Sequence, residues 1–296
     1  MSNEEVGQDW PRKPFQRSVL VMLASLLLPA CRALHRCGAE AISDRIRELD
    51  GPDQLVAEIH ETMEDGVERL FGWVSLEGAD PSYEATYELC RLFDPTPDTR
   101  DDQDPVVSAA IDRYLELIAE KPVIRYALSV TRSSISDLRN TWFGPTRAFE
   151  HVFAGEISAD GSVGGYHWWY KFWREEQQGL VDYTRTVEGI DDPRIATICF
   201  TWDPDGVAKR FSTHEKSIGG FTVGDSPCAL LALGFIALKC GLNRYDWERR
   251  PDFKANLNGR QYEWVVVVTE DRANLVSLYP LANDWQSGRE SLLPAY

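Results

Sequence analysis

Two histidines and one lysine stand out because their side chains could move protons and stabilise negative charge. The 296-residue chain has only five histidines, and His151 and His167 flank the turn sequence Ala-Asp-Gly-Ser at 159–162. Asp-Gly dipeptides favour hairpins because both residues tolerate positive φ. We therefore expect a hairpin that brings the two imidazoles toward each other, as acid–base catalysis requires.

The surroundings of the two histidines predict different proton states. We expect His151 within a strand over 148–158, between Glu150 and Glu156, and carboxylates favour a protonated imidazole that can act as an acid. His167 should lie at the start of a helix, where the positive end of the dipole favours a neutral imidazole that can act as a base. Two unrelated polar residues remain the alternative interpretation.

Lys216 lies in the sequence HEKSIGGFTVG, close to a glycine pair. A lysine beside glycines can direct its charge at a phosphate in a confined site. His214 would share the face of Lys216 simply because side chains alternate along a strand, so both a structural and a functional role stay open for it. Lys209 is interpreted as a solvated hairpin residue.

Other catalytic classes lack their motifs, since the chain has no GxSxG, HExxH, P-loop or GxGxxG sequence. Around His151, Glu150 and Glu156 form an incomplete and irregular ligand set for a metal. No cysteine pair has zinc-knuckle spacing among Cys31, Cys37, Cys90, Cys199, Cys228 and Cys240. The net charge of −16 argues against broad electrostatic attraction to nucleic acid but not against a small basic site.

Residues 18–140 are expected to be mainly helical. Apolar residues recur three and four apart over 39–50, 53–74 and 104–120. A loop rich in Pro and Asp over 93–105 separates two of these stretches. His35 and His60 fall in this half and are interpreted as structural.

Past Pro145 the pattern changes to short β-type runs separated by turn sequences. The runs cover 148–158, 180–188, 194–202, 207–224, 262–270 and 274–282. Helices are expected from His167 to Gly179 and from Ser226 to Gly241, the second capped by Ser226 and apolar all round. The predicted fold class is α+β: a helical N-terminal half followed by antiparallel-sheet hairpins with two interrupting helices.

The predicted organisation is a flexible tail over 1–17, a mainly helical part over 18–144 and a strand-rich catalytic part over 145–296. The apolar run over 18–30 follows three basic residues, so it fits either a helix packed on the domain or a secretory segment. It is too short to span a bilayer, and we expect no stable membrane insertion. The compartment, cytoplasmic or secreted, stays undetermined.

Three segments resemble the signature sequences of the EndoU (XendoU) endoribonucleases: FEHVFAGE at 149–156, GGYHWWYKFW at 164–173 and KSIGGFTVGDSP at 216–227. The resemblance implies an EndoU-like fold and RNA cleavage giving 2′,3′-cyclic phosphate and 5′-hydroxyl ends. It implies that His151 protonates the leaving 5′ oxygen, that His167 deprotonates the 2′ hydroxyl, and that Lys216 stabilises charge on phosphorus. Glu150 and Glu156 match two supporting glutamates.

The resemblance also implies a uridine-binding set. The sequence VSLYP at 276–280 is similar to a segment of the distantly related coronavirus endoribonuclease, which implies that Tyr279 packs on the base with Ser277 close by. Gly220 stands where the family usually carries a serine that reads uracil, and its backbone amide could donate instead. Trp168 replaces the asparagine of the family's GxHNW sequence.

The implied partner is single-stranded RNA, without cleavage of DNA, which lacks the attacking hydroxyl. Stimulation by Mn²⁺ is implied by the resemblance, although no ligand motif is present. Two alternatives stay open: a relative that has lost turnover and binds RNA or protein, and a secreted ribonuclease toxin or effector. The oligomeric state is not predicted.

Overall fold

The structure, a computed structural model, describes residues 41–50, 56–64, 67–75, 78–96, 99, 101–187, 193–204, 213–242, 253–257 and 261–281. The predicted tail over 1–17, the apolar run over 18–30, His35 and Lys209 lie outside these ranges. Within them, none of the helices combines the length and the apolar character needed to cross a membrane.

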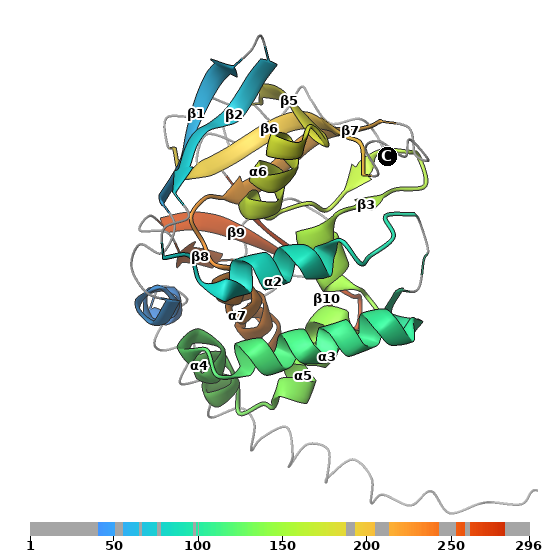
Figure 1. The fold of residues 1–296 in the computed structure, drawn as a ribbon. Coiled ribbons are helices and arrows are strands. Elements are labelled where there is room, and N and C mark those ends of the chain that lie inside the picture. Colours follow the sequence, from blue (N-terminus) through green and yellow to red (C-terminus); the bar gives the residue numbers. More distant parts are fainter. Residues whose placement is uncertain are drawn as a thin grey trace, which may run out of the picture.

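Helices gather in one half of the molecule (Figure 1). Residues 41–50 are helical, and four further helices follow: α2 (Pro81–Cys90), α3 (Pro105–Ala119), α4 (Pro122–Thr131) and α5 (Ile135–Phe143). Proline occupies the first turn of α2, α3 and α4, where its missing N–H costs nothing. Ser134 and Asp137 form a capping box at the start of α5.

The prediction of a helix over 53–74 is wrong, because this stretch forms an antiparallel hairpin. Strand β1 (Val56–Glu64) pairs with β2 (Val67–Ser75). The sequence Asp65-Gly66 separates the two strands, and such a dipeptide is a strong hairpin signal. The apolar residues of this stretch fit a helical period as well as a strand, so their spacing did not distinguish the two.

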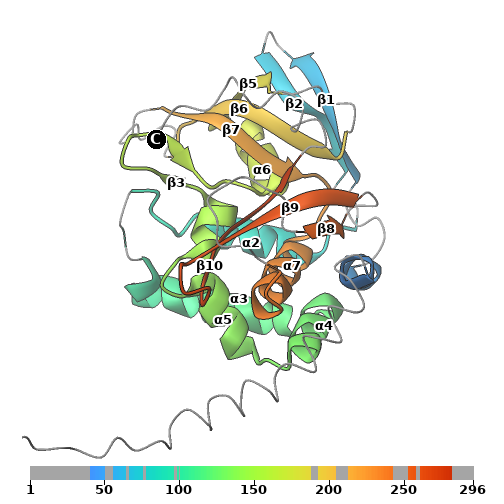
Figure 2. The same cartoon turned by 180° about the vertical axis from the view of Figure 1, so that it is seen from behind.

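Two three-stranded antiparallel sheets form the second half (Figures 1 and 2). One has the order β5 (Val181–Thr186), β6 (Ile195–Trp202), β7 (His214–Thr222). The other has the order β10 (Leu275–Leu281), β9 (Gln261–Val268), β8 (Phe253–Asn256), of which β8 was not predicted. The strands β7 and β10 contact each other and so join the two sheets.

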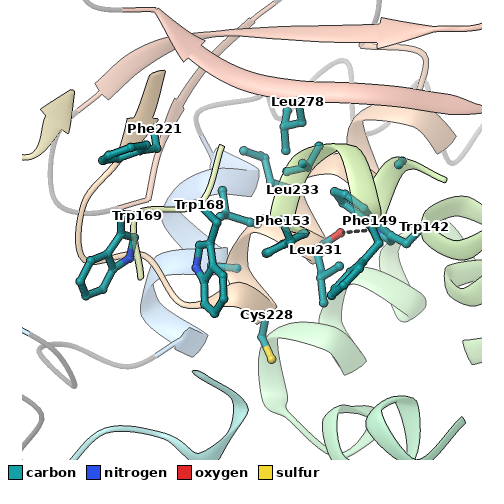
Figure 3. Packing of buried hydrophobic residues seen from close by; sticks show 14 of the residues in the cluster. Trp142, Phe149, Phe153, Trp168, Trp169, Phe221, Cys228, Leu231, Leu233 and Leu278 are labelled. Carbon is teal, nitrogen blue, oxygen red and sulfur yellow. Dashed lines mark hydrogen bonds between the residues drawn. The ribbon is translucent and has the colours of Figure 1, made fainter. Parts of the chain in front are cut away.

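The two interrupting helices are confirmed as α6 (Trp169–Gln178) and α7 (Pro227–Lys239). Gly179 ends α6 in the left-handed conformation, and Ser226 caps α7 through the N–H of Ala229. Helix α7 is buried along nearly its whole length. The indole of Trp142 on α5 donates to the carbonyl of Leu231 on α7 at 3.1 Å (Figure 3).

One continuous aromatic core connects the helices to the segments that carry the histidines. Phe149 and Phe153 stack with ring centroids 4.9 Å apart, and Phe153 meets Trp168 at 5.5 Å. All three side chains are fully buried in the cluster shown in Figure 3. Burying several large aromatic rings stabilises this region strongly, so the segments next to it are held in fixed positions. The α+β fold class is confirmed.

Candidate active site

The first histidine lies in a turn of π-helix, not in a strand as predicted. The turn spans Glu150–Ala154, and the Gly155 N–H donates to the Glu150 carbonyl at 2.8 Å. Phe149, Val152 and Phe153 are buried, and their spacing of three and four places one helical face in the core. His151 is thereby left partly exposed beside that core. Such π-turns are often found at functional sites.

The predicted hairpin is present and returns a carboxylate to His151. Strands β3 (Glu156–Ile157) and β4 (Val163–Gly164) pair across the Asp160-Gly161 turn. The Nδ1 atom of His151 lies 2.8 Å from Oε1 of Glu156. This hydrogen bond is the main reason that the pKa of Glu156 is lowered, against an opposing effect of burial. The carboxylate is therefore stabilised in its charged form beside the imidazole.

The second histidine is tied to the first through two consecutive backbone hydrogen bonds. The Tyr166 N–H donates to the His151 carbonyl at 2.8 Å, and the His167 N–H donates to the Val152 carbonyl at 2.7 Å. Gly165 makes this approach possible, because a Cβ there would lie 1.8 Å from the His151 carbonyl oxygen. The two imidazole centroids are 5.8 Å apart, as the predicted turn required.

The imidazole of His167 is oriented by two distant strands. Its Nδ1 lies 3.0 Å from the carbonyl oxygen of Gly220 on β7. Since a carbonyl only accepts, Nδ1 carries the proton, and Nε2 holds the lone pair in the neutral ring. The ring stacks on Tyr279 of β10, with centroids 5.2 Å apart and planes 24° apart. Helix α6 begins two residues after His167, at Trp169.

Lys216 lies on β7 and reaches the same hairpin. Its Nζ donates to the Val163 carbonyl at 3.0 Å, and it is among the cations that lower the pKa of Glu156, after the His151 hydrogen bond. His214 on the same strand donates from Nδ1 to the Gly161 carbonyl at 2.6 Å. The two side chains attach the hairpin to β7, which gives His214 a structural role.

Glu150 and Glu156 have different surroundings. The buried carboxylate of Glu150 has Oε1 3.4 Å from the Arg147 guanidinium, whereas Glu156 contacts the imidazole of His151 directly. Arg147 in turn donates to the carbonyl of Thr99. This places Glu150 among the groups that fix the base of the π-turn, and Glu156 among those that touch the candidate catalytic side chains.

The residues predicted to bind the base lie on β7 and β10. Ser277 lies on β10 two residues before Tyr279, is 4% exposed, and its Oγ makes no hydrogen bond within the described part of the chain. Gly220 contributes its carbonyl to His167. Thr197 on β6, which the sequence did not single out, pairs directly with Gly220. Its Oγ1 lies 3.9 Å from where a Gly220 Cβ would be. Strand register alone reveals this neighbour.

Trp168, which departs from the family sequence, points into the core. It is fully buried, and its ring lies 5.5 Å from that of Phe153 and 6.4 Å from that of Tyr83. It occupies the N-cap position of α6 without a side-chain capping bond. The substitution therefore changes packing behind the histidines and not the face that carries their imidazoles.

The donor set does not fit a resident metal ion. Among the residues that the structure describes, no group of three or more His, Cys, Asp or Glu side chains could hold one. The nearest carboxylate to His151, that of Glu156, already accepts its hydrogen bond. The arrangement can let one imidazole accept a proton from a substrate while the other donates a proton to it, beside a fixed ammonium group.

Comparisons with known proteins match this arrangement to one family. The family model described as Endoribonuclease XendoU matches residues 54–280, and so extends across the predicted boundary at 144. The uridylate-specific endoribonucleases of Bos taurus and Homo sapiens are each 38% identical over 119 residues, covering 35% of this chain and 26% of the relative. The matched stretch is thus about a quarter of those relatives.

Other relatives extend the match. Uridylate-specific endoribonuclease EndoU of Drosophila melanogaster is 29% identical over 171 residues, covering 49% of this chain and 50% of the relative. A solved structure of XendoU, described as a splicing independent snoRNA processing endoribonuclease, has a TM-score of 0.58 and 21% identity. It covers 81% of this chain and 96% of its own. The resemblance noted in the sequence is confirmed, and the fold is shared.

Proposed function

This chain belongs to the XendoU endoribonuclease family, and from that premise we propose that it cleaves single-stranded RNA at uridylates. The proposed reaction is attack of a ribose 2′ hydroxyl on the adjacent phosphate, giving 2′,3′-cyclic phosphate and 5′-hydroxyl ends. The observation that carries the proposal is a pair of imidazoles with centroids 5.8 Å apart, one bonded to a carboxylate and the other to a carbonyl.

We assign the base to His167. Its Nδ1 donates to the Gly220 carbonyl, which leaves the Nε2 lone pair to accept the proton of the 2′ hydroxyl as the new O2′–P bond forms. A fixed hydrogen bond on one ring nitrogen selects the tautomer in which the other can act as a base. Stacking on Tyr279 further restricts rotation of the ring.

We assign the acid to His151 and charge stabilisation to Lys216. The Glu156 carboxylate beside Nδ1 of His151 favours the imidazolium, which then donates a proton to O5′ as the P–O5′ bond breaks. Two protons are exchanged in total, so the enzyme ends with the opposite protonation of each imidazole. The Lys216 ammonium exchanges the Val163 carbonyl for a phosphate oxygen on which negative charge develops.

The base-binding side would be formed by Tyr279, Ser277 and Gly220. Tyr279 offers an aromatic surface next to the His167 ring, and the Ser277 hydroxyl is buried without a hydrogen-bond partner in the described part of the chain. Buried hydroxyls without partners are costly, and a base edge would satisfy this one. The mammalian relatives are named as uridylate-specific, which supports uridine as that base.

Manganese is proposed to act through the RNA. The described residues do not supply a ligand set for a resident ion, so no step is assigned to one. An ion bound to RNA phosphates would reduce the repulsion between substrate and a chain of net charge −16. If so, other divalent cations and higher monovalent salt should replace part of any Mn²⁺ effect.

The test uses an oligonucleotide with one ribouridine in a deoxy backbone, incubated with and without Mn²⁺, with product ends read by mass spectrometry. We expect a cyclic phosphate at the ribouridine, no cleavage of the all-deoxy strand, and loss of product with His151→Ala, His167→Ala and Lys216→Ala. Folded protein that cleaves no ribonucleotide would contradict the proposal and favour a relative that binds RNA without turnover.

A further inference from the structure

We propose that Tyr166 is a positioning residue that fixes the separation of the two catalytic imidazoles, and that a buried ion pair holds its side chain in place. The inference rests on the proposed function, because it concerns the geometry of the same reaction. It goes beyond it by assigning a role to three side chains that do not belong to the histidine and lysine set.

The backbone of Tyr166 has an unusual conformation that the site depends on. Its φ is +68°, in the left-handed region that a bulky aromatic residue rarely adopts and that strains the backbone. This conformation directs the Tyr166 N–H to the His151 carbonyl and the following His167 N–H to the Val152 carbonyl. Relaxation of φ at this one residue would therefore move His167 relative to His151.

The side chain of Tyr166 is locked on every side. The ring is fully buried and lies 5.1 Å from the ring of Phe200 and 5.4 Å from that of Trp202. Gly155 leaves the room for it, because a Cβ there would come within 2.6 Å of Tyr166 Cδ2. The hydroxyl donates to Oε2 of Glu175 at 2.5 Å. The ring thus has a fixed position, and its hydroxyl has a fixed direction.

The acceptor of that hydrogen bond belongs to a buried ion pair. Lys171 Nζ lies 2.6 Å from the same Oε2 of Glu175, 3.8 Å from the Tyr166 ring centroid and 4.5 Å from that of Trp202. The side chains of Lys171 and Glu175 are 3% and 7% exposed. A buried ion pair adds little net stability compared with apolar residues of similar volume, so packing alone does not explain this one.

The need to orient the Tyr166 ring explains the buried ion pair better than packing does. The phenol hydroxyl donates one hydrogen bond to the carboxylate, and the ammonium group attracts the face of the same ring. Together these two contacts specify the tilt and the depth of the side chain. Apolar residues would fill the space without fixing either. The Lys171–Glu175 pair lies on α6, the helix that follows Tyr166 and His167 in the chain, and through the Tyr166 backbone it reaches the His151 carbonyl.

The test compares Tyr166→Phe with Tyr170→Phe on two substrates, the ribouridine oligonucleotide and uridine 3′-(4-nitrophenyl phosphate). Tyr170, in the first turn of α6, is a matched control, because its hydroxyl bonds Glu84 at 3.1 Å, away from the histidine segments. Since a misplacement of about 1 Å can cost about 100-fold in rate, we expect kcat of Tyr166→Phe to fall about 10-fold or more on both substrates. KM should stay within about twofold, and Tyr170→Phe should match the parent.

Glu175→Gln supplies a second variant that keeps an acceptor for the hydroxyl, so it should retain more kcat than Tyr166→Phe at comparable thermal stability. If Tyr166→Phe does not fold, the test is a lower kcat of Glu175→Gln than of Tyr170→Phe with KM within about twofold, and equal kcat values would overturn the inference. A Tyr166→Phe protein with the parent kcat, whatever its thermal stability, overturns the inference.

NMR spectra of the histidine imidazoles separate this inference from the proposed function. Tyr166→Phe should change the chemical shifts of the His151 and His167 rings, and Tyr170→Phe should not. If the parent protein cleaves neither substrate, the proposed function fails, and unchanged ring shifts would then overturn the positioning role independently of activity.

Discussion

The two imidazoles are held by different chemistry, although both use Nδ1. His151 bonds a carboxylate that returns on the neighbouring hairpin, 2.8 Å away. His167 bonds a backbone carbonyl of β7, 3.0 Å away, and stacks on Tyr279 of β10. A carboxylate carries charge that favours an imidazolium, whereas a carbonyl only selects a tautomer. The partner of each ring therefore supports the proposed assignment of the acid to His151 and of the base to His167.

The two imidazoles also differ in how far along the chain their partners lie. The partner of His151 comes from the same short stretch of sequence, within the β3–β4 hairpin, so local turn chemistry is enough to assemble it. The partners of His167 come from two strands of two separate sheets. The base is therefore the half of the site that depends on the assembly of the whole fold.

The largest expected effect separates the two roles through the leaving group. His151→Ala and His167→Ala should each slow cleavage of the ribouridine oligonucleotide by about 10²–10⁴-fold, the usual contribution of acid–base catalysis. On uridine 3′-(4-nitrophenyl phosphate), whose leaving group needs no proton, His151→Ala should recover most of its rate, whereas His167→Ala should not. Initial rates followed by nitrophenolate absorbance check this.

His214→Ala is the matched control, because His214 bonds the hairpin carbonyl of Gly161 and not the reacting groups. It should lose much less rate than either catalytic variant on both substrates. Recovery by His167→Ala instead of His151→Ala would exchange the two assignments. An equal loss of rate by both variants on the nitrophenyl substrate would contradict the assignment of separate acid and base roles to the two rings.

The next effect comes from removing the charge beside His151. Glu156→Gln keeps a hydrogen-bonding group of the same shape but not the carboxylate. A hydrogen bond to a charged group contributes about 1.5–3 kcal/mol, so we expect kcat to fall about 10–100-fold. Initial rates on the ribouridine oligonucleotide measure this loss.

The same carboxylate predicts a pH dependence of stability. The hydrogen bond to His151 lowers the pKa of Glu156 from its usual 4.5. A depressed folded-state pKa contributes stability that is present above 4.5 and lost as the pH falls through the lower value. Urea unfolding at pH 6 and pH 3 should show a smaller acid loss for Glu156→Gln than for the parent. An identical loss of stability in the two proteins would mean that the Glu156–His151 hydrogen bond does not stabilise the folded state.

A buried carboxylate whose pKa is raised by burial should behave in the opposite way. Glu176 on α6 accepts hydrogen bonds from the N–H groups of Leu70 at 2.7 Å and Phe71 at 3.4 Å, and it joins β2 to the helix. Burial raises its pKa from 4.5 to about 7, although these N–H groups oppose the shift. The stability linked to it is present below pH 4.5 and lost as the pH rises through about 7.

Glu176→Gln should therefore flatten the loss of stability between pH 5 and pH 8, by up to about 3 kcal/mol at 1.36 kcal/mol per pKa unit. Urea unfolding at the two pH values measures it. Glu116→Gln, on the exposed face of α3, is the control that should leave the slope unchanged. If the loss of stability between pH 5 and pH 8 persists in Glu176→Gln, it arises from other buried acids such as Asp225, whose pKa is raised by burial to about 7.

The features of the fold and of the candidate site that could be predicted from the sequence are those that depend on local chemistry. The Asp160-Gly161 turn, the cap at Ser226 and the left-handed Gly179 depend on residues close in sequence, and the structure has all three. The π-turn at His151 was missed because an aromatic and β-branched run was interpreted as a strand, although Phe149, Val152 and Phe153 follow helical spacing. The hairpin formed by β1 and β2 was missed in the opposite direction, because its apolar residues also fit a helical period.

What the sequence could not supply is register between distant strands. Gly220 and Tyr279 were singled out only through the family resemblance, and nothing in their own surroundings indicates that both contact His167. Thr197 was not singled out at all, since only its pairing with Gly220 brings it to the site. Such contacts depend on how two sheets meet, which no local pattern encodes.

The smallest effect tests the base-reading side of His167. A serine at 220 would fit, because a Cβ there meets the Ala196 and Pro280 carbonyl oxygens at 3.4 Å, an ordinary contact. Gly220→Ser should therefore unfold with nearly the parent free energy, keep the carbonyl bond to His167, and add a hydroxyl beside Thr197. We expect a few-fold higher preference for ribouridine over ribocytidine, since one hydrogen bond contributes about 0.5–1.5 kcal/mol. Gly220→Ala, with the same Cβ and no hydroxyl, should leave the preference unchanged. An equal gain with alanine would mean that strand rigidity, and not base reading, sets selectivity on this side of the site.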